Sequence, residues 1–157
     1  MTDIHGNRLK IALVASSGGH LSQLLKLRDA WQGHDVFYIV TTDVVKEKLG
    51  ADKRVYVSGE CNRQNIFRVA NVFLRSARAI RCERPDVVLS TGAAVGCLSC
   101  FVGKWFGARV VWVDSITNVN RMSLSGRMVR YITDLCLVQW PSLAQKYKRA
   151  EYVGNII

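Results

Sequence analysis

The chain has 157 residues, of which 49% are hydrophobic and 22% are charged. This composition excludes a disordered or collagen-like polypeptide and fits one globular domain over residues 1–157, large enough to bury a core without disulfides or metal. Its 22 lysines and arginines outnumber 12 acidic residues, so the formal charge of +10 favours a polyanionic partner: nucleic acid, a membrane surface or a phosphorylated substrate. We expect only the polar start, residues 1–9, to be flexible.

The five cysteines are an odd set scattered through apolar segments, which indicates a reduced, intracellular protein rather than a disulfide framework. Cys97 and Cys100 form a C-x-x-C pair, but one pair cannot complete a four-cysteine zinc site, so we expect buried thiols and no metal. The apolar run 11–15 is too short for a signal peptide, and Ser90-Thr91-Gly92 divides the uncharged run 87–103 into a strand, a turn and a helix. The sequence therefore predicts a cytoplasmic protein without a membrane span.

Short apolar runs alternate with helical periods along the chain, which is the pattern of a parallel sheet covered by helices. We therefore predict an α/β fold with a doubly wound, mostly parallel, Rossmann-like sheet. The expected strands are Lys10–Ala15, Val36–Thr41, Arg54–Val57, Asp86–Ser90, Arg109–Asp114, Leu135–Gln139 and Tyr152–Val153. The expected helices are His20–Trp31, Asn65–Cys82, Ala93–Phe106, Ser123–Ile132 and Ser142–Lys148, with a short addition over Asp43–Leu49.

The loop after the first strand is the first candidate site, because ligands of such sheets bind beyond the carboxyl ends of the strands. It reads Ser16-Ser17-Gly18-Gly19-His20 and leads into an apolar helix. Glycines admit a ligand close to the backbone, and free amides at a helix start attract phosphate. The spacing matches neither the dinucleotide fingerprint nor the P-loop, and a ligand-free tight turn explains the same residues.

Small polar residues and carboxylates follow the later strands as well. Asp43 and Glu60 have an alternative interpretation as a helix cap and a solvated acid. Asp114 is harder to explain in that way, because it ends the very apolar strand Val110–Val113. The sequence has no D-x-D carboxylate pair, which argues against a nucleotide held through magnesium.

Three segments carry a resemblance to a known family: SSGGHLSQLL, PDVVLSTGAAVG, and VDSITNVNRMSLSGRMVRYITDLCLVQWPSLAQKY with AEYVG. They resemble the split-glycosyltransferase subunits, which include the membrane-anchoring subunit of the UDP-GlcNAc transferase of asparagine-linked glycan assembly and the PssD-type bacterial capsule and exopolysaccharide proteins. The glycine-rich opening is shared with MurG-like transferases, whereas SLSGR followed by DLCLVQWP is specific. The family usually has glutamate where this chain has Asp114, which keeps the carboxylate but shortens its reach.

The resemblance implies the amino-terminal, acceptor-side half of a GT-B glycosyltransferase, with a donor-binding partner subunit that supplies the UDP-sugar site of the heterodimer. The implied reaction is inverting, metal-independent transfer to a polyprenyl-diphosphate-linked acceptor in polysaccharide or lipid-linked oligosaccharide biosynthesis, with no cofactor. His20 and then Asp114 are the candidate bases. The residues expected to bind the acceptor and its phosphate are Ser17, Gly18, Gly19, Thr91, Gly92 and Ser115.

The remaining family motif has two interpretations. Ser123, Ser125, Gly126 and Arg127 match the family, but helix capping and interdomain packing explain them as well as contact with substrate does.

Two other function classes stay open. The chain could be a non-catalytic scaffold that recruits and activates its partner at the membrane, or an unrelated Rossmann-like protein that binds nucleotide or nucleic acid. Nucleic acid is disfavoured because all four tryptophans fall in apolar segments rather than among basic residues; these are Trp31, Trp105, Trp112 and Trp140.

The charge is better assigned to lipid headgroups, and the helix Asn65–Cys82 shows how. Arg68, Arg75 and Arg78 share one quadrant of this helix, and Phe67 and Leu74 lie at its boundary. This face predicts peripheral attachment to an anionic membrane on its cytoplasmic side, although an ordinary solvated basic face gives the same spacing. The side expected to face the sheet comprises Ile66, Val69, Ala70, Phe73, Ala77 and Ile80.

Overall fold

The computed structural model describes residues 8–50, 52–60 and 65–157, except the side chain of Lys48. Most of the expected flexible start, residues 1–9, and Cys61 lie outside these ranges. The strands are β1 (Lys10–Ala15), β2 (Asp35–Val40), β3 (Arg54–Val57), β4 (Val87–Ser90), β5 (Arg109–Val113) and β6 (Leu135–Leu137). The helices are α1 (Gly19–Lys26), the 3-10 helix η1 (Arg28–Trp31), α2 (Val44–Leu49), α3 (Ile66–Glu83), α4 (Ala93–Trp105), α5 (Leu124–Val129) and α6 (Pro141–Lys146).

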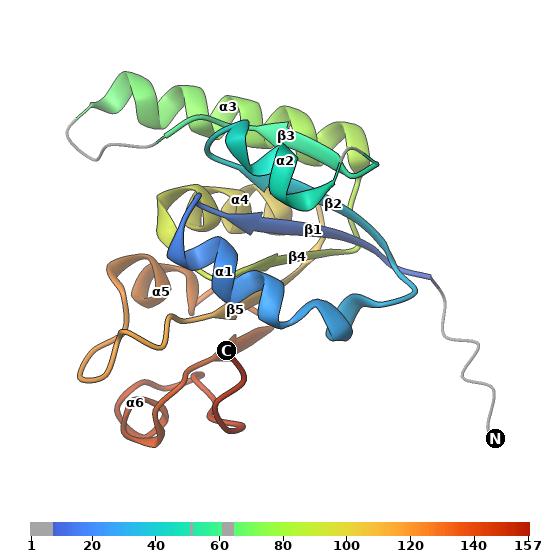
Figure 1. Ribbon diagram of the computed structural model, residues 1–157. Helices are drawn as coiled ribbons and strands as arrows, with labels where there is room; N and C mark the ends of the chain where they lie inside the picture. Colours follow the sequence, from blue (N-terminus) through green and yellow to red (C-terminus); the bar gives the residue numbers. More distant parts are fainter. Residues whose placement is uncertain (1–7, 51, 61–64) are drawn as a thin grey trace, which may run out of the picture.

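All strand pairs are parallel, in the order β3-β2-β1-β4-β5-β6. The chain builds outward from β1 to β3, returns through α3 to β4 on the other side of β1, and continues outward to β6 (Figure 1). The strand order therefore reverses between β1 and β4, which is the topological switch point of a doubly wound sheet. The predicted α/β, Rossmann-like fold is confirmed.

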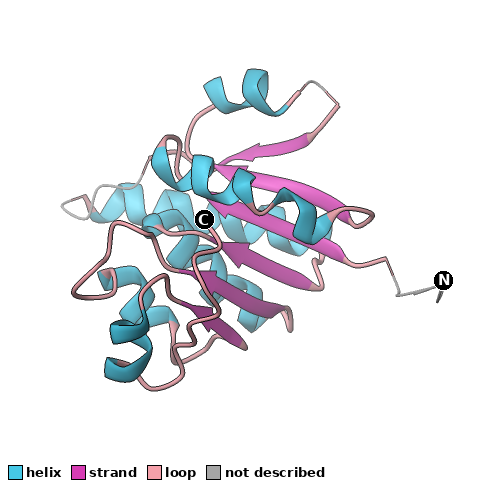
Figure 2. Cartoon of the chain, turned by 60° about the horizontal axis from the view of Figure 1, so that its bottom comes forward, coloured by secondary structure: helices cyan, strands magenta, loops and turns pink. Residues whose placement is uncertain are grey.

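Helices cover both faces of the sheet, because right-handed crossovers send the helices of its two halves to opposite faces (Figure 2). One face packs against α3, α4 and α5 through side chains such as Val72 and Val95. The opposite face of β1 and β2 packs against α1, η1 and α2 through side chains such as Leu24 and Val45.

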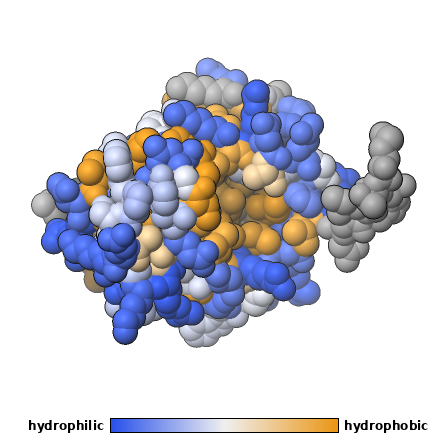
Figure 3. All heavy atoms as spheres, turned by 90° about the horizontal axis from the view of Figure 1, so that it is seen from below, coloured by the Kyte–Doolittle hydropathy of each residue, from blue (hydrophilic) through white to orange (hydrophobic). Residues whose placement is uncertain are grey.

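Among the described helices, none covers the second face at β5 and β6. The apolar cluster there is built from strand residues and from loop residues at the chain's end, with Val113, Leu137 and Ile157 buried. Val111 and Leu135 are only partly buried. Viewed from the side of α6 and the C-terminus, the surface has a hollow lined by hydrophobic residues and rimmed by hydrophilic ones (Figure 3). This half of the sheet is incompletely covered.

Three charged residues and one tyrosine join the strands to the end of α3. We call them the amino-edge cluster: Glu83, Lys10, Arg54 and Tyr56. The Tyr56 hydroxyl donates to Glu83 Oε1 at 2.7 Å, and Lys10 and Arg54 donate to Oε2 at 3.2 and 2.8 Å. Arg54 also pairs with Asp35. Burial raises the pKa of Glu83, but the two hydrogen bonds from Tyr56 and Lys10 and the positive charges outweigh it, so this pKa lies below its usual value.

Local structure departs from the sequence predictions at several places: β6 ends at Leu137 and α6 at Lys146, each two residues earlier than predicted. The helix expected over His20–Trp31 ends at Lys26 and resumes as η1. Helix α5 stops at Val129 instead of Ile132. Tyr152–Val153 is not a strand, because the only strand-like pairing near it is an isolated bridge between Leu137 and Glu151.

The thiols of the C-x-x-C pair are buried, as predicted: Cys97 and Cys100 belong to α4 and lie in the core. Burial raises the pKa of Cys100 well above its usual value and that of Cys136 to about 12. Within the described residues, no group of histidine, cysteine and acidic side chains could hold a metal ion.

The predicted sheet-facing side of α3 is partly wrong. Ile66 and Phe73, expected to pack on the sheet, are 75% and 41% exposed. Apolar residues occur nearly all round this helix, so their period does not select one side, and the small Ser76 and Ala79 let another side approach the sheet. The buried residues are Val72, Ser76, Ala79 and Ile80.

Two further observations concern the surface. No helix in the described part of the chain is long and apolar enough to cross a membrane. Trp105, which ends α4, is 87% exposed, unlike the buried Trp31 and Trp112.

Candidate functional site

The loops after β1 and β4 meet at the switch point, where ligands of doubly wound sheets bind. The loop after β1 holds Gly18 at φ +99°, and a Cβ on Gly18 or Gly19 would meet nothing within 4 Å. Both glycines are exposed, and the first amides of α1 have no partner within the helix. This open turn at a helix start suits an approaching phosphate.

His20 joins the two loops. Its Nδ1 lies 3.0 Å from the Thr91 carbonyl oxygen, and the Thr91 hydroxyl donates to the His20 carbonyl at 2.6 Å. A carbonyl oxygen only accepts, so Nδ1 carries the proton in this bond, and in the neutral ring Nε2 keeps its lone pair. Nε2 forms no hydrogen bond to another described residue. The half-buried imidazole is therefore held in the tautomer that can accept a proton.

The backbone after β4 is shaped around that ring. An added Cβ at Gly92 would lie 2.4 Å from His20 Cε1, so only glycine lets the imidazole lie against the chain here. Gly92 has φ +142°, and the next residue, Ala93, has φ +67°, in the left-handed region that alanine rarely adopts. Such strain persists only where the surrounding structure enforces it, and it clusters at functional sites.

Ser17 lies in a different part of the same sheet edge. Its amide donates to Thr41 Oγ1 at 3.0 Å, and the two hydroxyl oxygens are also 3.0 Å apart. They line a cavity of about 170 Å³ together with Glu60 and the first residues of α4. This volume is below the roughly 300 Å³ of an ordinary ligand pocket, so the cavity fits a small polar group rather than a sugar nucleotide.

Ser115, after β5, is tied to α1. Its Oγ accepts from Gln23 Nε2 at 2.9 Å and lies 2.9 Å from Thr117 Oγ1. Gln23 Oε1 is buried and has no hydrogen-bond partner among the described residues. The predicted lining residue Ser115 is therefore already bonded, and the unpaired acceptor belongs to Gln23, three residues after His20 on the same helix.

Asp114 is almost fully buried and saturated with hydrogen bonds. Oδ1 accepts from Trp112 Nε1 at 3.1 Å and from the Ser123 hydroxyl at 2.7 Å. Oδ2 accepts from Asn118 Nδ2 at 3.0 Å and from the Ser123 amide at 3.2 Å. These four bonds pin the 115–123 loop to the end of β5.

The SLSGR segment supports this carboxylate. Ser123 caps α5 by accepting from the Gly126 amide at 2.9 Å. A Cβ at Gly126 would lie 2.7 Å from Asp114 Oδ1, so glycine is required for the helix to pack this closely. Ser125 is buried, and Arg127 is half-buried with an Nε that no described residue pairs. The helix-capping interpretation is thus confirmed for Ser123, while a contact of Arg127 with substrate stays a prediction.

The candidate residues therefore form three neighbouring groups at the carboxyl edge of the sheet: Ser17 with Thr41, His20 with Thr91 and Gly92, and the Asp114 network reached through Ser115. Arg68, Arg75 and Arg78 lie apart from them on α3. The predicted site residues did not include Gln23, Thr41 or Asn118. Gln23 and Thr41 bond to residues distant in the chain, whereas Asn118 bonds to Asp114, four positions away. Only the i, i+3 spacing of His20 and Gln23 could have pointed to Gln23.

Comparisons with known proteins agree with this architecture. The sequence profile of the family described as "Oligosaccharide biosynthesis protein Alg14 like" matches residues 11–156. UDP-N-acetylglucosamine transferase subunit ALG14 of Candida albicans is 38% identical over 94% of this chain and 78% of its own length. The MurG structure from Acinetobacter baumannii superposes with a TM-score of 0.75 at 13% identity, over 94% of this chain.

A UDP-GlcNAc 2-epimerase from Methanocaldococcus jannaschii superposes almost as well, with a TM-score of 0.71 at 15% identity over 94% of this chain. The fold alone therefore does not distinguish sugar transfer from epimerisation. This chain spans 46% of the MurG chain and 46% of the epimerase chain, about half of each. The profile match over nearly the whole sequence decides the family: the chain belongs to the Alg14-like oligosaccharide biosynthesis proteins.

Proposed function

We propose that this chain is the acceptor-side subunit of a two-chain inverting glycosyltransferase, which transfers a sugar from a UDP-sugar to a polyprenyl-diphosphate-linked glycan. The observation that carries the proposal is His20, held at the switch point with its Nε2 lone pair available. Alg14-like relatives bear the name of a UDP-N-acetylglucosamine transferase subunit, which supports the reaction class.

His20 acts as the general base in this proposal. Direct displacement at the sugar requires removal of the proton from the acceptor hydroxyl, and histidine is the side chain most often used for that step. The bond to the Thr91 carbonyl orients the ring and stabilises the imidazolium that forms. Asp114 then serves as a positioning residue, because its oxygens already accept four hydrogen bonds.

The acceptor is bound around this base. The exposed turn at Gly18 and Gly19 receives a phosphate of the acceptor's diphosphate at the start of α1. The unpaired Gln23 Oε1 accepts a hydrogen bond from a hydroxyl or amide group of the acceptor glycan, since a buried acceptor without a partner is costly in the unbound state.

A partner subunit supplies the donor site. This chain matches 46% of the MurG chain, and its relatives bear the name of a transferase subunit, which supports a partner that carries the donor site. The incompletely covered face of β5 and β6, with its apolar hollow (Figure 3), supports the presence of another polypeptide on this half of the sheet. In this proposal the heterodimer is cytoplasmic and lies peripherally on the cytoplasmic face of the membrane that carries its acceptor, and the odd, scattered set of cysteines supports this location.

A second candidate function is a scaffold that positions a catalytic partner and supplies no catalytic group. It is favoured by the structural use of the family motif: Asp114, Ser123 and Gly126 all bond or pack within the chain. In this alternative His20 only ties the loops after β1 and β4 together.

The test compares His20→Ala with His34→Ala, a control histidine that accepts a bond from the Leu9 amide far from the switch point. Each variant is assayed with the partner subunit, UDP-sugars and a polyprenyl-diphosphate glycan, and wild type is also assayed alone. We expect no turnover by the isolated chain. Loss of a general base lowers kcat by about 10²–10⁴-fold, so His20→Ala should do this at nearly unchanged Tm and partner affinity. Full activity of His20→Ala in the heterodimer would establish the scaffold instead.

A further inference from the structure

Helix α3 exposes apolar side chains to solvent on the side opposite to the sheet. Phe67 and Leu74 are 82% and 65% exposed, and Ile66 is 75% exposed. At about 100° per residue, Phe67 and Leu74 project opposite to the buried residues Val72 and Ile80. Large side chains on a helix surface that no described residue covers mark an interaction site.

The surface continues onto the end of the neighbouring helix α4, which packs beside α3. Trp105 is 87% exposed there, and Phe106 is 51% exposed. Phe106 lines one cavity together with Arg78 and Arg81 of α3, so the two helices share this surface.

Basic residues flank the apolar side chains without acidic neighbours. Arg68, Arg75, Arg78 and Arg81 are exposed, and none forms an ion pair with a described residue. Glu83 is the only acidic residue of α3, and it is turned into the amino-edge cluster. An apolar face bordered by unneutralised arginines is the composition of helices that lie in the interface of anionic bilayers.

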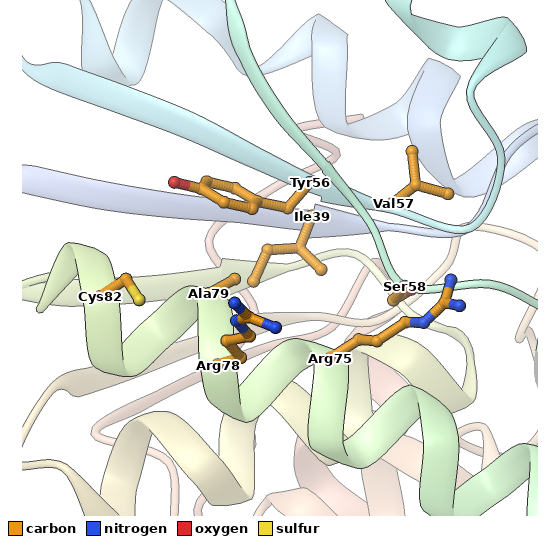
Figure 4. A pocket seen from close by; sticks show the side chains of 8 residues that line it. All are labelled: Ile39, Tyr56, Val57, Ser58, Arg75, Arg78, Ala79 and Cys82. Carbon is orange, nitrogen blue, oxygen red and sulfur yellow. The ribbon is translucent and has the colours of Figure 1, made fainter.

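The arginine flank also borders a groove. Arg75 and Arg78 extend from α3 beside Tyr56, Val57 and Ser58 of the β3 segment, around a cavity of about 310 Å³ (Figure 4). Its walls are mostly apolar, while the guanidinium groups supply five fixed donors each. This combination fits the phosphate of a lipid headgroup next to the hydrocarbon boundary.

From these observations we propose that α3 and the end of α4 dock the protein on an anionic phospholipid bilayer. Phe67, Leu74 and Trp105 enter the boundary between headgroups and acyl chains, while Arg75 and Arg78 bind headgroup phosphates. The assignment deepens the proposed function, on which it rests, because α3 begins at the carboxyl edge of the sheet. Docking through α3 places the start of this helix, and with it the candidate acceptor site, close to a lipid-linked substrate.

The experiment measures co-sedimentation of the full chain with vesicles of equal parts phosphatidylglycerol and phosphatidylcholine. One variant reverses charge (R68E/R75E/R78E), and another removes apolar area (F67S/L74S). The matched controls lie on the helices of the opposite face. K26E/R28E/K46E is the control for charge, and V44S is the control for apolar area, because Val44 is 65% exposed. Circular dichroism confirms that each variant is folded.

Wild type should bind, lose binding as salt rises, and fail to bind pure phosphatidylcholine. Each near-surface arginine contributes roughly a factor of five toward anionic lipid, so the charge variant should bind on the order of 100-fold more weakly. The apolar variant should bind several-fold more weakly, and both controls should match wild type. Brominated acyl chains should quench wild-type fluorescence, and Trp105→Phe should remove most of that quenching.

Equal binding by wild type and both α3 variants would overturn the proposal, as would binding without quenching. The surface would then be a protein interface, and the α3 variants would change the oligomeric state or partner affinity instead. A water-soluble, short-chain acceptor separates the two proposals, because the α3 variants should transfer sugar to it as fast as the wild-type heterodimer. Absence of that transfer in wild type would count against the proposed function alone.

Discussion

Replacing Asp114 by asparagine tests whether this residue is structural or chemical. The substitution keeps size and shape but converts one acceptor oxygen into an NH₂ donor. The best orientation keeps the carbonyl oxygen facing Trp112 Nε1 and the Ser123 hydroxyl, which leaves the new donor facing Asn118 and the Ser123 amide. Asn118 can rotate its amide to accept, whereas the backbone N–H of Ser123 cannot adapt.

The expected loss of folding stability follows from these contacts. A buried donor without an acceptor costs about 1–3 kcal/mol, and two bonds that lose a charged acceptor weaken by roughly 1 kcal/mol each. The variant no longer has to bury a charged carboxylate, and this gain offsets part of the loss of stability. We therefore expect Asp114→Asn to lower the free energy of unfolding by about 2–3 kcal/mol, or Tm by roughly 4–12 °C for a domain of this size.

Thermal and urea unfolding followed by circular dichroism measure this change. Asp43→Asn is the matched control, because Asp43 is exposed and its side chain makes no capping bond to α2, so its Tm should stay within about 2 °C of wild type. If Asp114→Asn keeps the wild-type Tm and m-value but lowers kcat of the heterodimer more than about 100-fold, Asp114 is the base and the positioning role is wrong.

Two further substitutions test the opposite edges of the sheet. Gly92→Ala places a methyl group 2.4 Å from His20 Cε1 and should lower kcat at least about 10-fold by displacing the ring, whereas Gly107→Ala, at φ +86° with open space around it, should cost stability but not activity. Equal kinetic effects of the two would contradict the fit of His20 against Gly92. Glu83→Gln should lower Tm at pH 7, because a carboxyl pKa below its usual value stabilises the fold above that value and the stabilisation is lost as the pH falls through the folded-state pKa. The Tm difference from wild type should therefore shrink below roughly pH 4, and a difference independent of pH would show that the charge of Glu83 is not responsible.

The sequence predicted most of the fold because its signals are local. β1 and β3 have the predicted bounds, and four further strands lie within one or two residues of theirs. The break after Lys26 was missed because apolar spacing continues through Trp31, although the chain tightens to a 3-10 turn. The buried side of α3 was misassigned because its burial depends on the small Ser76 and Ala79, which carry little weight in a hydrophobic pattern.

The sequence predicted which residues lie at the carboxyl edge of the sheet, but not which hydrogen bonds they form. Placing ligand residues after the strands found His20 and Thr91, which are 71 positions apart and bonded to each other. The state of Asp114 could not be read in the same way, because three of its four hydrogen bonds come from the loop and helix cap that follow. A carboxylate ending an apolar strand looks like a base in the sequence, but it becomes an anchor once Asn118 and Ser123 fold back onto it.

The two edges of the sheet therefore have different roles, as their ion pairs and hydrogen bonds indicate. At the amino edge, carboxylates are satisfied by cations from neighbouring elements: Glu83 by Lys10 and Arg54, and Asp134 by Lys104. These contacts fix the ends of β1, β3 and α3 and leave few groups free for a ligand. At the carboxyl edge the Asp114 network is equally closed, but the glycine turn has open space around it, and His20 Nε2 and Gln23 Oε1 have no partner among the described residues. Because a buried acceptor without a partner costs stability in the unbound chain, Gln23 Oε1 beside the switch point is best explained by a polar ligand that pairs with it there.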